Sequence, residues 1–148
     1  MLTRFDDLVR RGDPERPAVT FKGGTLTYGR LAEQVQAAGA GLRALGLERG
    51  DRVLVYLEKR LETVVTLFAA SAAGLVVVPV NPLLKAGQVG FIAGDCTARA
   101  VVTSPGRLQT VREELPGSVA HVVVVGDRAG AGDDGGALTV TADRKSVV

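Results

Sequence analysis

The sequence has 148 residues, enough for one domain with its own hydrophobic core or for part of a larger domain. Its formal net charge is only +2 and its acidic and basic residues are interspersed, which argues against a nucleic-acid-binding surface. The single cysteine, Cys96, excludes an internal disulfide and is typical of a reducing compartment.

The first residues do not have the pattern expected of a signal peptide. Residues 1–13 mix acidic side chains with arginines and contain no continuous apolar stretch of the kind that signal peptides have. We therefore expect a cytoplasmic protein.

The N-terminal part of the chain predicts a short helix followed by a hairpin. Apolar residues at helical spacing predict the helix over residues 2–11. Residues 18–21 and 25–27 read as two short strands, joined by a tight turn at Gly23-Gly24.

A longer amphipathic helix is predicted next. Thr27 supplies the hydroxyl of a helix N-cap, and Gly46 is a natural C-terminal stop. Between them the apolar residues fall on one stripe: Leu31, Val35, Ala38, Leu42 and Leu45.

From Arg52 onward, strands alternate with helices. The expected strands cover residues 52–57, 76–80, 99–103 and 121–125, and the expected helices residues 61–73, 86–94 and 106–115. Near-continuous valine runs suit parallel strands that are covered on both faces, and alternation implies right-handed crossovers. The sequence therefore predicts an α/β fold: a partial, doubly wound, mainly parallel sheet with helices on both faces, preceded by a short N-terminal helix and hairpin.

The most apolar segment is Leu61 to Pro82, and it has two readings. It is long enough to cross a bilayer. However, Gly74 interrupts it, Pro79 lies near its end, and no Lys/Arg-rich flank marks one side. We expect a buried helix that ends at Gly74 and leads directly into a buried strand.

A glycine motif near the C-terminus is better explained as a loop. Gly130, Gly132 and Gly135 satisfy the dinucleotide-binding pattern G-x-G-x-x-G. No amphipathic helix follows them, and Asp133 and Asp134 would place negative charge where phosphate should bind. We expect a solvent-exposed loop.

Other chemically active residues form no recognisable catalytic set. His121 is the only histidine and begins a predicted strand, so we expect a partly exposed structural role. Cys96 follows an acidic residue, which raises a thiol pKa, so we expect it to pack. One histidine and one cysteine give no metal-ligand spacing. The serines lie outside any nucleophile elbow: Ser71, Ser104, Ser118 and Ser146.

Several short motifs occur in the order and spacing of one family. They are Arg16-Pro17-Ala18-Val19, Leu26-Thr27-Tyr28, Gly41-Leu42 to Gly46-Leu47, Gly50-Asp51-Arg52-Val53, Ala73-Gly74, Pro79-Val80-Asn81-Pro82 and residues 92–98. Over residues 16–127 the chain resembles the N-terminus of the AMP-forming acyl-CoA synthetase and ligase superfamily, the adenylate-forming enzymes. Residues 56–65 and 78–96 further resemble the acyl-CoA ligases associated with exosortase-type polysaccharide export systems.

One residue departs from the family pattern. The family has a glutamate three residues after the helix N-cap, where it closes a capping box, and this chain has Arg30 there. A cation near the positive end of a helix is unfavourable by about 0.3–1 kcal/mol. We therefore expect Arg30→Glu to stabilise the fold.

The resemblance implies an activity for a full-length parent protein. A carboxylic acid would react with ATP to give an acyl-adenylate, and coenzyme A would then displace AMP to give a thioester. Magnesium ion is implied as well, with a small-molecule acid as substrate, no nucleic acid partner and no transmembrane segment. The family's phosphate loop ending in Pro-Lys-Gly and its later catalytic lysine have no counterpart in this sequence. We therefore assign no catalytic, cofactor-binding or metal-binding residue, and we expect the chain alone to be an inactive N-terminal fragment.

The resemblance also predicts the domain boundaries. Residues 1–127 correspond to the N-terminal part of an AMP-binding, or adenylation, domain, and residues 128–148 are expected to be a disordered loop and tail. Residues 143–148 match what one reading frame of a common short-read sequencing adapter encodes, so we expect them to be a sequencing artefact.

An alternative reading remains on sequence grounds. A parallel sheet by itself is compatible with a stand-alone Rossmann-like or flavodoxin-like module for nucleotide binding or protein interaction. The expected strand ends at residues 58–60, 81–82 and 104–105 carry no phosphate cradle, which argues against a nucleotide site of that kind.

Overall fold

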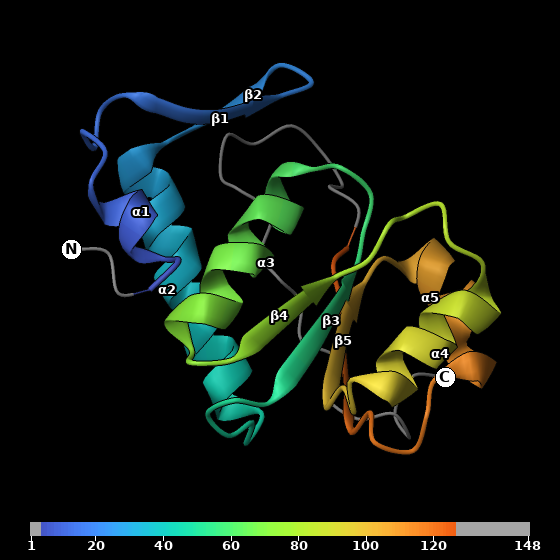
Figure 1. Cartoon of the computed structure of the whole chain (residues 1–148). Helices are drawn as coiled ribbons and strands as arrows, with labels where there is room; N and C mark the ends of the chain where they lie inside the picture. Colours follow the sequence, from blue (N-terminus) through green and yellow to red (C-terminus); the bar gives the residue numbers. More distant parts are fainter. Residues whose placement is uncertain (1–3, 127–148) are drawn as a thin grey trace.

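The computed structural model describes residues 4–126 and shows an α/β fold (Figure 1). Its main sheet has four parallel strands in the order β4-β3-β5-β6, and a separate antiparallel sheet is formed by β1 and β2. The strands are β1 (Pro17–Phe21), β2 (Gly24–Thr27), β3 (Arg52–Tyr56), β4 (Val76–Pro79), β5 (Ala100–Thr103) and β6 (His121–Val124). The helices are α1 (Asp7–Arg10), α2 (Tyr28–Ala44), α3 (Leu61–Ala72), α4 (Ala86–Asp95), α5 (Pro105–Val111) and the 3₁₀ turn η1 (Arg112–Glu114).

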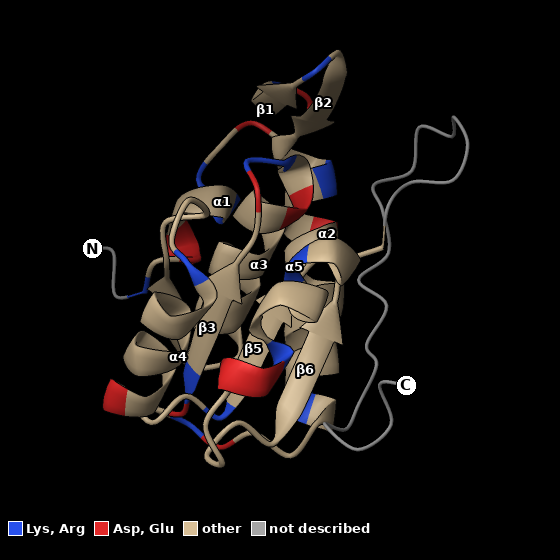
Figure 2. Cartoon of the chain, turned by 90° about the vertical axis from the view of Figure 1, so that its right-hand side faces the viewer, with Lys and Arg blue, Asp and Glu red and all other residues tan. Residues whose placement is uncertain are grey.

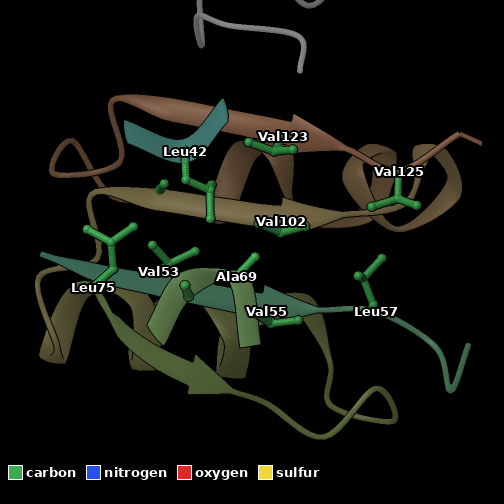
Figure 3. Close-up of a cluster of buried hydrophobic side chains, with 11 residues drawn as sticks. Leu42, Val53, Val55, Leu57, Ala69, Leu75, Val102, Val123 and Val125 are labelled. Carbon is green, nitrogen blue, oxygen red and sulfur yellow. The ribbon is translucent and has the colours of Figure 1, made fainter. Parts of the chain in front are cut away.

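Helices cover both faces of the main sheet, which confirms the doubly wound prediction. Alternate side chains of a strand point to opposite faces. On one face Val53 and Val55 pack with α2 and α3 (Figure 3), and on the other Leu54 and Tyr56 pack with α4 and α5. The strands are almost free of charge along their length, and acidic and basic residues gather on helices and loops (Figure 2). Burial from both sides explains why these strands read as continuous valine runs.

Strand β4 is the exception, and here the expectation of a buried strand is wrong. Tertiary pairing places β4 at the edge of the sheet, so Val76 is 48% exposed. The edge position of β4 also explains why a proline, Pro79, is tolerated in this strand. The N–H of Val80 donates to Val55 O of β3, and that of Val76 donates to Asp51 O just before β3. Position 79 therefore faces the open edge, where proline removes no hydrogen bond from the ladder.

The junction between α3 and β4 forms as predicted. Gly74 has φ of 77°, the left-handed conformation that glycine adopts most easily. The N–H of Leu75 donates to Ala70 O and that of Gly74 to Ser71 O, the two bonds of a Schellman motif. Glycine therefore lets the chain turn directly from helix to strand.

The junction after α4 has the same geometry without glycine. Thr97 has φ of 50°, and the N–H of Ala98 donates to Ala93 O. A β-branched residue is strained in this region. Arg52 compensates in part, because its side chain donates to Cys96 O at 2.7 Å and to the hydroxyl of Thr97.

The start of α2 agrees with the sequence-based prediction. The hydroxyl of Thr27 accepts a hydrogen bond from the backbone N–H of Arg30 at 3.3 Å, so Thr27 is the N-cap. The guanidinium of Arg30 pairs with Glu33 at 3.1 Å on the exposed surface.

The N-terminal helix is much shorter than the predicted range 2–11. Only Val9 of α1 is buried, whereas Phe5 and Leu8 are 47% and 44% exposed. One buried side chain per turn does not support a longer helix. The segment is held instead by Asp6, whose carboxylate accepts a hydrogen bond from the hydroxyl of Ser71 on α3 at 2.8 Å.

Within residues 4–126, no helix combines the length and apolar character that crossing a bilayer requires. The apolar segment from Leu61 to Pro82 is divided between α3, β4 and their junction, as expected.

Candidate functional site: a crevice at the carboxyl ends of β3 and β5

The order of the strands creates a point of divergence in the main sheet. From β3 the chain passes through α3 to β4 on one side, and then crosses through α4 to β5 on the other side. Because crossovers are right-handed, this reversal of direction moves the helices from one face to the other. The loops that leave the carboxyl ends of β3 and β5 therefore separate, and in open α/β sheets ligands bind in such a crevice.

A crevice is present at this point, with a volume of about 490 Å³. It lies between the loop after β3, the loop after β5 and the tip of the β1–β2 hairpin. In Figure 1 the strands β3 and β4 run upward, toward the side on which the hairpin lies. The lining is mixed in character: Phe21, Lys22, Gly24, Glu58, Lys59, Arg60, Leu61, Glu62, Ser104, Pro105 and Gly106.

Glu58 joins the two loops. Its carboxylate accepts hydrogen bonds from Ser104 Oγ at 3.2 Å and from Arg107 Nε at 2.5 Å. Partial burial acts to raise the pKa of Glu58, but hydrogen bonds from its own backbone N–H, Arg107 and Ser104, with the charge of Arg107, outweigh it and lower the pKa below the usual value. Glu58 is thus an ionised anchor and is poorly suited to serve as a general acid.

Arg107 extends this network to a third loop. Its Nη1 donates to the carbonyl oxygen of Pro82 at 2.5 Å, and its guanidinium lies over the ring of Tyr56, 4.8 Å from the centroid. Tyr56 in turn donates its hydroxyl hydrogen to Leu84 O at 3.0 Å. The carboxyl ends of β3, β4 and β5 are therefore connected through one planar cation, which suits such multiple contacts.

A second ion pair borders the crevice at the start of α3. Arg60 Nε contacts Glu62 Oε2 at 2.9 Å, and both side chains are mostly buried, at 17% and 11% exposure. The hydroxyl of Thr63 donates to the carbonyl oxygen of Glu58 at 2.6 Å. These contacts fix the loop between β3 and α3.

The residues considered on sequence grounds are not brought together. His121 is half-buried at the start of β6, at the opposite end of the sheet, and Cys96 packs against the core at the end of α4. Ser71 binds Asp6, and Ser104 lines the crevice. Gly130, Gly132, Gly135, Asp133, Asp134 and Ser146 lie outside the described residues. In the described part of the chain, no group of three His, Cys, Asp or Glu side chains is arranged to hold a metal ion.

Sequence reasoning examined the strand ends for a phosphate cradle and overlooked the crevice between them. Glu58 and Arg107 are 49 residues apart, so no local pattern pairs them. The available signal was their place: both follow the carboxyl end of a predicted strand.

Comparison with known proteins decides the family. The sequence profile of the family described as "AMP-binding enzyme" matches residues 7–146. The chain belongs to the AMP-binding enzyme family. As a family member it is 38% identical over 122 residues to the L-proline–[L-prolyl-carrier protein] ligase of Pseudomonas fluorescens, covering 80% of this chain and 24% of that protein.

Two further comparisons support the assignment. This AMP-binding family member is 33% identical over 136 residues to the long-chain-fatty-acid–CoA ligase of Haemophilus influenzae, covering 89% of this chain and 24% of that one. The structure of ATP-bound MatB from Rhodopseudomonas palustris has a TM-score of 0.73 and 27% identity, covering 89% of this chain and 26% of that one. The chain spans about a quarter of the length of these relatives. Family membership does not favour the stand-alone Rossmann-like or flavodoxin-like alternative.

Proposed function

We propose that residues 1–127 form the N-terminal part of the adenylation domain of an ATP-dependent ligase that converts a carboxylic acid to its coenzyme A thioester. The family match over residues 7–146 carries this proposal. The relatives from Pseudomonas and Haemophilus are named as ligases that join proline or a long-chain fatty acid to a carrier protein or to coenzyme A, which supports a carboxylic acid as substrate.

The reaction has two steps. A carboxylate oxygen attacks the α-phosphorus of ATP, and pyrophosphate leaves; the thiol of coenzyme A then attacks the acyl carbon, and AMP leaves. Residues 4–126 contain neither a glycine-rich phosphate loop nor an acidic cluster for magnesium ion. These residues therefore do not fit an ATP–magnesium site, and neither step is assigned to them. We propose that the chain alone is inactive.

The genomic reading frame around this sequence provides the test. The protein from the complete frame should exchange labelled pyrophosphate into ATP in the presence of a carboxylic acid, whereas residues 1–148 should show no exchange. Absence of exchange by the complete protein across aliphatic, aromatic and amino acids would contradict the ligase activity. Exchange by residues 1–148 would contradict their inactivity.

A further inference from the structure

The tip of the β1–β2 hairpin carries an unexpected residue. Phe21 pairs with Gly24, so the turn consists of Lys22 and Gly23, with φ of 47° and 78°. Positive φ at both central residues is the requirement of a type I′ turn, in which Asn-Gly is strongly preferred. Lysine at the first position is therefore unfavourable for the turn itself, and such local strain calls for a role in the surrounding structure.

The location of Lys22 indicates that role. Lys22 lines the crevice at the carboxyl ends of β3 and β5, and Lys59 lines it from the loop after β3. Both residues are exposed, and neither forms a salt bridge within residues 4–126. The ammonium of Lys22 lies 5.4 Å from the ring centroid of Phe21, an arrangement that leaves it accessible to solvent.

The two acidic residues of the lining are already neutralised. Glu58 is paired with Arg107, and Glu62 with Arg60. Paired carboxylates contribute little net negative potential, so the lysines dominate the charge in the crevice. Ser104 and the backbone of Gly106 add polar groups on the side of β5.

We propose that this crevice is a binding site for an oxyanion of a small molecule, a phosphate or carboxylate group, with Lys22 and Lys59 as its cationic contacts. The site combines a divergence of loops that favours ligand binding, a cavity of about 490 Å³ and two lysines from separate segments. This proposal goes beyond the proposed ligase activity, because anion binding is measured on this chain without turnover. The binding proposal can therefore fail while the ligase proposal holds, and the ligase proposal can fail while the binding proposal holds.

The test titrates the 148-residue chain with inorganic tripolyphosphate or with tricarballylate, at constant ionic strength, while backbone amide signals are recorded by NMR. Tripolyphosphate should bind with a dissociation constant in the millimolar range and shift the amides of Lys22, Lys59, Ser104 and Gly106. Binding of tripolyphosphate alone identifies phosphate as the ligand group, and binding of tricarballylate alone identifies carboxylate. No saturable shift with either probe overturns the proposal.

Substitutions separate this site from general electrostatic attraction. Lys22→Asn removes the cation and gives the turn its preferred Asn-Gly sequence, so this variant should fold at least as well as the parent. Lys22→Asn and Lys59→Gln should each weaken binding about tenfold, the effect of losing one charge-assisted contact. Lys85→Gln makes the same charge change outside the crevice and should alter binding less than about twofold. Equal weakening by Lys85→Gln and Lys59→Gln overturns the proposal.

Discussion

Two carboxylates in this molecule have the same kinds of partner in opposite surroundings. Asp6 accepts hydrogen bonds from an arginine, Arg4, and from a serine hydroxyl, that of Ser71. Glu58 accepts hydrogen bonds from Arg107 and from the hydroxyl of Ser104. The side chain of Asp6 is only 3% exposed, whereas that of Glu58 is 44% exposed.

This difference in exposure separates two roles. Asp6 closes a junction: it joins the N-terminal segment to the end of α3, where Arg4 Nη2 also donates to Ala72 O at 3.3 Å. Glu58 borders an opening, where it ties the loop after β3 to the loop after β5 at the edge of the crevice. The same arginine–serine chemistry is thus used once to fasten a segment and once to shape a cavity.

The pKa of Asp6 is lowered, as that of Glu58 is. Burial acts to raise the pKa of Asp6, but hydrogen bonds from Arg4 and Ser71 and the charge of Arg4 outweigh it. A carboxylate with a lowered pKa in the folded state contributes stability that is complete above its unfolded pKa and is lost as the pH falls through its folded pKa. Both pairs should therefore weaken below about pH 4, since the unfolded pKa values lie near that pH.

The largest effect is expected at the buried carboxylate. Asp6→Asn should lower the free energy of unfolding by about 2–3 kcal/mol at pH 7, because it removes a buried charge from the guanidinium of Arg4. Urea unfolding at pH 7 and at successively lower pH measures the loss, which should shrink as the parent's own Asp6 becomes protonated. A pH-independent difference between parent and variant would show that the charge of Asp6 is not the cause. Asp95→Asn, at an exposed carboxylate at the end of α4, serves as the control.

The second prediction compares the two left-handed helix ends, both at the amino end of the main sheet. Gly74→Ala should destabilise the protein by about 1–2 kcal/mol, the cost of a side chain in this conformation. Thr97→Gly should relieve that strain but lose the contact with Arg52, so its net effect should be a stabilisation below about 1 kcal/mol. Thermal unfolding of the two variants checks the signs. Destabilisation by Thr97→Gly would mean that the Arg52 contact outweighs the strain.

The third prediction concerns the open carboxylate. Glu58→Gln should cost only about 0.5–1 kcal/mol at pH 7, because the exposed side chain is screened by solvent. This loss should also fade as the pH falls below the usual glutamate pKa. Urea unfolding across the same pH series as for Asp6→Asn provides the measurement. A cost equal to that of Asp6→Asn would remove the distinction between the closed and the open pair.

The smallest effect is expected far from both carboxylates, at the first turn of α2. Arg30→Glu should stabilise the protein by about 0.5 kcal/mol, because it restores the capping box and complements the helix dipole. Glu33 opposes this gain, since Arg30 now pairs with it at 3.1 Å. Arg30→Gln is the matched control, because it can cap without adding negative charge. A lowered melting temperature in both variants would contradict the capping argument.

Much of the local structure was predictable because its causes are local. Thr27 caps α2 and Gly74 ends α3 as predicted, since capping depends on a few neighbouring residues. The predicted extent of the helix over residues 2–11 was wrong, because periodicity does not reveal how few of its apolar side chains are buried. Val76 looked buried for a similar reason: a valine run does not distinguish a central strand from an edge strand.

For the candidate site, the sequence predicted the residue types but not the contacts between them. The sequence shows acidic, basic and hydroxyl residues after the strands, but Glu58 meets Ser104 across 46 residues and Arg107 across 49. The sequence predicted the hairpin turn at Gly23-Gly24, but the turn is Lys22-Gly23 because Gly24 pairs with Phe21. The place of Lys22 in the crevice depends on how that hairpin lies against the main sheet.

By itself, then, the sequence determined the alternation of strands and helices, the parallel α/β class and, through motifs in order, the family. The alternation and the α/β class follow from periodicity, capping and glycine geometry, which act over a few residues, whereas the family rests on the resemblance of the motifs. Tertiary structure alone decided the strand order β4-β3-β5-β6, the edge position of β4 and the crevice where the chain reverses direction. Such features depend on which distant segments pack together, because the free energy gained by burying apolar area does not depend on how far apart the residues are along the chain.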